Sequence, residues 1–121
     1  MNMKQNVVAD KSYAFALRVV KLYKHLRFTE QEFILSKQVL RSGTSIGANV
    51  EEAIAASSRA DFVNKLNIAA KETRETIYWL RLLKDSEFIS IKSFGSVYQD
   101  ATELQKILSS ILLTTKAIHN S

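Results

Sequence analysis

Apolar residues recur at spacings of three and four along nearly the whole of this chain of 121 residues. No segment shows the strict alternation of apolar and polar residues that is typical of a half-buried strand. The pattern predicts four helices, at approximately residues 11–26, 30–56, 59–85 and 91–118. Connections of about two to six residues force successive helices to run antiparallel. The sequence therefore predicts one all-α domain, an antiparallel up-down-up-down four-helix bundle.

Local start signals indicate where three of these helices begin. Asp10 is placed as the N-cap of the first helix. The run Thr29–Glu32 matches a capping box for the second helix, and Phe28 and Phe33 flank it as a hydrophobic staple. The run Ser58–Asp61 has the S-x-x-D form of a third start, just before an apolar segment.

The second predicted helix combines an apolar seam, a polar row and two glycines. The seam consists of Val39, Ile46, Val50 and Ala53. The polar row beside it consists of Gln38, Arg41, Ser45, Asn49 and Glu52. Gly43 and Gly47 each cost about 0.5–1 kcal/mol relative to alanine inside a helix. We therefore expect the backbone of a neighbouring helix to approach closely at these glycines.

Two roles fit Arg41, Ser45, Asn49 and Glu52. They can form a hydrogen-bonded network that fixes the register of helices or subunits, because partly buried polar groups need partners. They can also form a binding site for a small polar ligand or a partner. We favour the structural network. Glu72 and Glu75 on the third helix are interpreted as part of a solvated face, and Trp79 as a core or interface residue.

Apolar residues cover about 220° of the first predicted helix, at 100° per residue. They are Tyr13, Phe15, Ala16, Leu17, Val19, Val20, Leu22, Tyr23 and Leu26. A corner helix of an isolated bundle needs an apolar face of little more than about 100°. The surplus predicts a second buried contact, most simply with another subunit of a homo-oligomer.

The net charge of +5 is concentrated at the start of the chain. Residues 1–27 contain six cations and one anion, whereas residues 28–121 contain eleven of each. Such an asymmetry can mark a surface for phosphate backbones. The candidate nucleic-acid contacts are Lys11, Arg18, Lys21, Lys24 and Arg27. The alternative is a modestly basic surface with no such role.

No residue pattern indicates an enzyme, a metal site or a cofactor. The chain has no cysteine, which excludes thiolate zinc sites, thiol catalysis and disulfides. His25 and His119 lack the Glu-x-x-His context of di-iron bundles, and no nucleophile elbow or phosphate loop is present. The longest uncharged segments have nine residues, too few to span a membrane, and no signal peptide is recognisable. We expect a cytoplasmic protein.

The run Leu40–Ala53 reads LRSGTSIGANVEEA. It resembles the signature of small bacterial four-helix proteins that are encoded in intervening sequences of 23S rRNA genes. Residues 13–26 and 61–83 are similar to the first and third helices of that family. The resemblance implies a ring-like homopentamer. It also implies kinship with the accessory protein of diversity-generating retroelements, which is basic and binds nucleic acid and a reverse transcriptase.

The sequence thus predicts a non-enzymatic homo-oligomer, with the pentamer implied by the resemblance, that associates with RNA or DNA as an accessory protein. The alternative is a scaffold that docks a protein partner and binds no nucleic acid. Neither role involves a membrane, a metal or a cofactor. Arg41, Ser45, Asn49 and Glu52 are the signature residues in this chain and are not expected to be catalytic.

Overall fold

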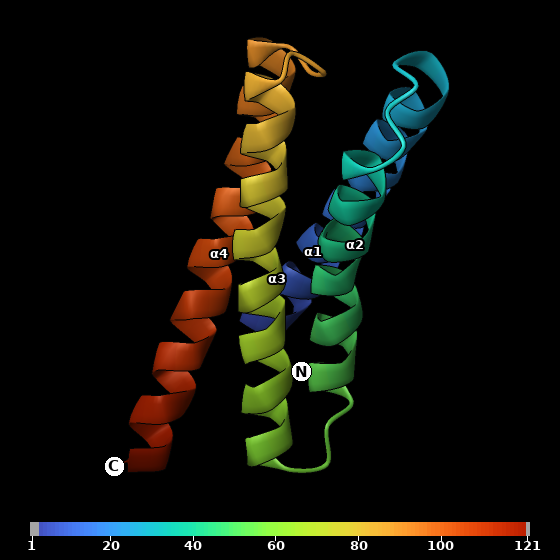
Figure 1. The fold of residues 1–121 in the computed structure, drawn as a ribbon. Helices are drawn as coiled ribbons and strands as arrows, with labels where there is room; N and C mark the ends of the chain where they lie inside the picture. Colours follow the sequence, from blue (N-terminus) through green and yellow to red (C-terminus); the bar gives the residue numbers. More distant parts are fainter. Residues whose placement is uncertain (1–2, 121) are drawn as a thin grey trace.

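The computed structural model describes residues 3–120 and the side chains of residues 3–117. Within this range the chain forms helices α1 (Met3–Lys24), α2 (Leu35–Ile54), α3 (Arg59–Asp85) and α4 (Ile91–Asn120), shown in Figure 1. A π-helical turn, η1 (His25–Thr29), continues α1 without a break. No strand occurs among the described residues.

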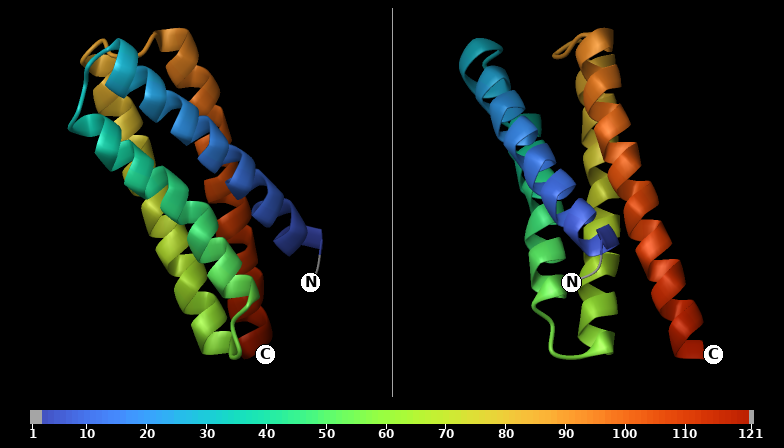
Figure 2. Two further views of the ribbon diagram at one scale, coloured as in Figure 1. Left: turned by 90° about the vertical axis from the view of Figure 1, so that its right-hand side faces the viewer. Right: turned by 180° about the vertical axis from the view of Figure 1, so that it is seen from behind.

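Successive helices run antiparallel, and each packs against two neighbours (Figure 2). Helix α1 contacts α2 and α4, and α3 contacts the same two helices from the opposite side. The seam of α2 faces this centre, because Val39, Ile46 and Val50 are completely buried. The predicted all-α four-helix architecture is therefore confirmed.

Helix α1 begins earlier than the sequence indicated. It already includes Met3, so Asp10 lies inside the helix and is no N-cap. Val8 and Ser12 are buried on the inner side of this early segment, where they pack among the core helices. The segment is helical because its apolar positions find a core to bury them, which outweighs the local cap signal.

The connection between α1 and α2 also differs from the prediction. Residues 30–34 are not helical, and α2 begins at Leu35. Gln31 adopts a left-handed φ of 56°, and the amide of Glu32 donates to the Leu26 carbonyl at 2.8 Å, which ends the preceding helix. The Glu32 carboxylate instead accepts from the amide of Ser36 at 2.7 Å. The run that matched a capping box therefore lies between the two helices. The amide of Glu32 closes the end of the preceding helix, and its carboxylate caps α2 from a position before Leu35.

The start of α3 follows the predicted signal. The hydroxyl of Ser58 accepts a hydrogen bond from the amide of Asp61 at 3.1 Å, while the backbone of Ser58 is extended. This satisfies one of the free amides at the helix N-terminus. At the other end, Glu87 has a φ of 64° and turns the chain into α4.

Candidate nucleic-acid interface

The five cations proposed for phosphate contact separate into two groups. Lys11 and Arg18 lie on the side of α1 that faces α4. Arg18 pairs with Asp100 at 2.6 Å and donates to the Ser96 hydroxyl at 3.0 Å. Lys11 pairs with Glu103. The hydrogen bond to that carboxylate, together with its negative charge, raises the pKa of Lys11 above its ordinary value of 10.5. These two cations hold α1 against α4.

The other three cations lie around the end of α1. Lys21 and Lys24 are exposed, and neither pairs with an anion among the described residues. The guanidinium of Arg27 lies over two rings, 5.7 Å from the centroid of Phe28 and 5.2 Å from that of Phe33. The two rings are 71% and 49% exposed. We call these five residues the α1-end patch; it brings cations and accessible aromatic rings together.

A groove of about 1720 Å³ borders this patch, between the end of α1 and the turn from α3 to α4. Its lining has cations and carboxylates in comparable number: Arg18, Lys21, Lys84, Lys92, Glu30, Asp85 and Glu87. Positive charge therefore does not dominate the groove. The α1-end patch owes its basic character to the outward side chains of α1 instead.

Arg41 from the polar row of α2 reaches across to α3. Its guanidinium pairs with Glu75 and lies 3.4 Å from a carboxylate oxygen of Glu72. The Glu72 side chain is only 14% exposed. The indole nitrogen of Trp79 donates to the same Glu75 carboxylate at 2.9 Å. The interpretation of the two glutamates as a solvated face was therefore wrong: they lie in a network between two helices.

The rest of the polar row does not cross between helices in the described structure. The amide of Asn49 donates to the backbone carbonyl of Ser45 at 2.9 Å and to its hydroxyl at 3.0 Å, within α2 itself. Glu52 is exposed and forms no ion pair with a described residue. The second link between the helices is a buried one that sequence reasoning missed: the hydroxyls of Ser42 and Thr76 are hydrogen bonded at 2.9 Å.

The two glycines of α2 pack against α1. A Cβ at Gly47 would lie 3.3 Å from the backbone oxygen of Ser12. A Cβ at Gly43 would lie 2.7 Å from a methyl group of Val19. The expected close backbone approach is thus confirmed at Gly47, whereas at Gly43 a side chain occupies the space.

Part of the wide apolar arc of α1 remains uncovered in the single chain. Tyr13 is 64% exposed and Leu17 is 58% exposed. Phe15 and Val19, on the opposite side of the helix, are buried. An isolated exposed apolar residue is ordinary on a protein surface. Two neighbours one helical turn apart form a continuous apolar surface on the outside of α1.

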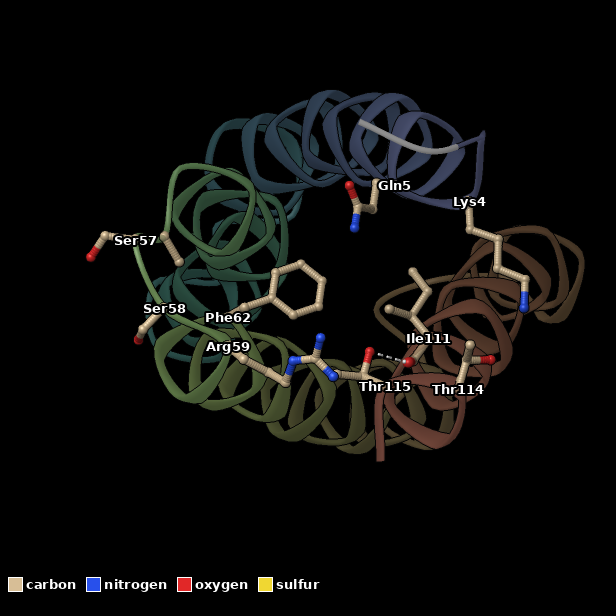
Figure 3. A pocket seen from close by; sticks show the side chains of 10 residues that line it. Lys4, Gln5, Ser57, Ser58, Arg59, Phe62, Ile111, Thr114 and Thr115 are labelled. Atoms are coloured by element: carbon tan, nitrogen blue, oxygen red, sulfur yellow. Dashed lines mark hydrogen bonds between the residues drawn. The ribbon is translucent and has the colours of Figure 1, made fainter. Parts of the chain in front are cut away.

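A pocket of about 420 Å³ opens at the end of the bundle where α3 begins. Phe62 and Arg59 reach into it from α3, Gln5 from α1 and Ile111 from α4 (Figure 3). Its hydroxyl groups come from serines and threonines, and no histidine or carboxylate lies among the lining residues that the structure describes. Lys4 also lines the pocket, and its amine donates to the hydroxyl of Ser110 at 2.8 Å.

The described part of the chain contains no group of three or more His, Cys, Asp or Glu side chains that is placed to hold a metal ion. His25 lies 3.4 Å from Glu30, and the side chain of His119 lies outside the described residues. No described helix combines the length and apolar character needed to cross a membrane.

The fold and the patch define a small helical-bundle protein with a basic and aromatic surface at one end of its first helix. The 23S rRNA-intervening sequence protein family matches residues 4–110, and the chain belongs to this family. One solved structure is similar to this chain, with a TM-score of 0.90 and a sequence identity of 58%. The match covers 91% of this chain and 98% of the solved chain. The solved chain is described as a protein with unknown function from the S23 ribosomal protein family of Bacteroides thetaiotaomicron. No curated protein matches this chain.

Proposed function

We propose that this protein is a non-enzymatic, homo-oligomeric accessory protein that associates with RNA. The observation that carries the proposal is the α1-end patch, where the exposed and unpaired Lys21 and Lys24 precede Arg27, whose guanidinium lies over the exposed rings of Phe28 and Phe33. Cations attract phosphates irrespective of sequence, and exposed rings offer stacking surfaces to unpaired bases. The rings favour a nucleic acid with unpaired bases, which RNA presents in its single-stranded loops and ends.

The proposal moves the phosphate contacts toward the end of α1. Lys11 and Arg18 are neutralised by carboxylates of α4, so releasing them for RNA would break two contacts between helices. Lys21 and Lys24 require no such rearrangement. We therefore assign the phosphate contacts to these two lysines and to Arg27, and a structural role to the other two cations.

The affinity for RNA should depend on the α1-end patch and on salt. In fluorescence anisotropy titrations, changing Lys21 and Lys24 to glutamine should weaken binding and flatten the salt dependence. Each lost contact should reduce the slope of log affinity against log salt by about 0.7 for single strands and 0.9 for duplexes. Lys37→Gln combined with Lys106→Gln, which removes two exposed charges on α2 and α4, is the matched control. Absence of binding at low salt would refute the proposal.

Assembly of several copies into a ring-like homopentamer forms part of the proposal. The uncovered surface of Tyr13 and Leu17 supports it, because covering these side chains removes apolar area from water. Several copies of the α1-end patch in one ring would also bind one RNA together, which gives a higher overall avidity than the affinity of a single patch. Light scattering coupled to size exclusion should give several times 13.7 kDa, and Leu17→Glu should reduce that mass. A monodisperse wild-type monomer at micromolar concentration would contradict this assignment.

A protein-interaction scaffold is the second candidate, and the same apolar surface of α1 favours it. Tyr13 and Leu17 would then contact a different protein instead of another copy. Salt separates the two functions, because phosphate binding weakens steeply with ionic strength whereas an apolar contact does not. A partner that binds equally well at low and high salt would favour the scaffold.

A further inference from the structure

The outer face of α3 carries a strip of positive charge. Lys71, Arg74, Tyr78 and Arg81 are all exposed, and their spacing of three and four residues places them along one side of the helix. At a rise of 1.5 Å per residue the strip is about 15 Å long. We call these four residues the α3 strip.

The positive charge of the α3 strip is not neutralised inside the bundle. Its three cations form no hydrogen bond or ion pair with any residue that the structure describes. Of the carboxylates of α3, Asp61 lies near the start of the helix, and Asp85, one turn beyond Arg81, lies 3.5 Å from the amine of Lys84. Glu72 and Glu75 are turned to the α2 side, where Arg41 pairs with both. Arg41 offsets one of these two negative charges on the α2 side of the helix, away from the strip.

The ring of Tyr78 lies between these cations in sequence and is 51% exposed. It meets the ring of Trp79 in a T-shaped contact, with centroids 5.1 Å apart and planes at 72°. Trp79 in turn donates to Glu75, which Arg41 holds from α2. This series of contacts connects a signature residue of α2 to an exposed aromatic ring and fixes the ring on the surface.

We propose that the α3 strip binds single-stranded RNA, with its cations on phosphates and Tyr78 stacked on an unpaired base. This inference rests on the proposed function and adds a second contact surface to it. A single strand is favoured because a duplex keeps its bases stacked on one another, whereas a single strand presents free base faces to a ring. An acidic protein would satisfy the cations but would leave the exposed ring unused.

The test uses Trp79, the only tryptophan of the chain, as a local reporter. The full-length protein is titrated with a labelled oligouridine of about twelve nucleotides, within the usual range of single-strand sites, and with a duplex of equal length. Anisotropy follows total binding, and tryptophan emission follows events beside Tyr78. We expect the single strand to change the emission of Trp79 and the duplex to leave it unchanged.

Substitutions separate the ring from the charges. Tyr78→Ala should weaken binding of the single strand about tenfold, the scale of one base–ring stack, and Tyr78→Phe should preserve it. Arg74→Gln combined with Arg81→Gln should reduce the salt slope by about 1.4, at about 0.7 per phosphate. Lys37→Gln combined with Lys106→Gln again controls for the loss of two charges. Circular dichroism checks that the exposed substitutions leave the helices folded.

The outcomes distinguish this inference from the proposed function. RNA binding with unchanged Trp79 emission and full affinity of Tyr78→Ala would overturn the α3 strip and leave the α1-end patch in place. Absence of any RNA binding at low salt would overturn both. Displacement of the RNA by polyglutamate at equal charge concentration would show a general surface for anions and would also overturn the assignment to RNA.

Discussion

Replacing Gly43 by alanine tests the tightest contact between α1 and α2. The new Cβ would lie 2.7 and 2.8 Å from the two methyl groups of Val19, closer than any ordinary carbon contact. Val19 is completely buried. A valine in a helix has one strongly preferred χ1 rotamer, so it cannot turn its methyl groups away at low cost. Helix α1 must therefore move away from α2, which disturbs the packing along both helices.

Two opposing effects set the magnitude. Alanine gains about 0.8–1.0 kcal/mol over glycine in helix propensity. Overpacking of a well-filled core costs typically about 1–3 kcal/mol. We expect Gly43→Ala to lower the free energy of unfolding by about 1 kcal/mol net. For a domain of this size the loss corresponds to a fall in Tm of roughly 3–6 °C.

Urea denaturation followed by circular dichroism measures the change, and Gly95→Ala provides the control. Gly95 is an exposed position of α4 where an added Cβ meets nothing within 4 Å, so alanine should stabilise it by about 0.5–1 kcal/mol. In a Val19→Ala background, Gly43→Ala should become stabilising because the clash is removed. If Gly43→Ala stabilises the wild type as much as Gly95→Ala does, the close-contact argument is wrong.

Three further predictions concern the contacts that link the helices. Thr76→Val should leave the buried hydroxyl of Ser42 without its partner and lower the free energy of unfolding by about 1–3 kcal/mol in urea denaturation. Adding Ser42→Ala should recover part of this loss. An unchanged urea midpoint for Thr76→Val would contradict the hydrogen bond. Ser58→Ala should remove the cap of α3 and cost about 1 kcal/mol in the same assay. The pair of Lys11 with Glu103 raises the pKa of the lysine, so its stabilisation is present below pH 10.5 and is lost as pH rises through the raised value. Glu103→Gln should therefore reduce the fall in Tm above that pH, and an identical alkaline profile would show that the pair contributes nothing.

The candidate site could be predicted from the sequence only in part. The polar row of α2 was visible because residues three and four apart share a helix face. Which member of the row has a partner on another helix was not visible: Arg41 reaches Glu72 and Glu75, whereas Asn49 bonds only within α2 among the described residues. The direction of a polar side chain depends on the neighbour that packs beside it.

The connection between α1 and α2 shows a similar limit for local signals. The run Thr29–Glu32 has the letters of a capping box, and Glu32 does cap α2, but from a position before the helix. The chain first needs residues 30–34 to leave α1 and turn back, with Gln31 in the left-handed region. A capping pattern reports that a helix end is near and does not specify which helix end it serves.

The sequence by itself determined the number of helices, their order and the buried seam of α2, because helical periodicity is a local property that any segment carries wherever it packs. Only the tertiary structure decided which charges are free. Arg18 is neutralised by Asp100, 82 residues further along the chain, and Arg41 of α2 offsets one of the two glutamate charges of α3. Coulombic pairing depends on distance in space. Equal numbers of cations and anions along residues 28–121 therefore did not indicate that the cations of the α3 strip have no partner among the described residues.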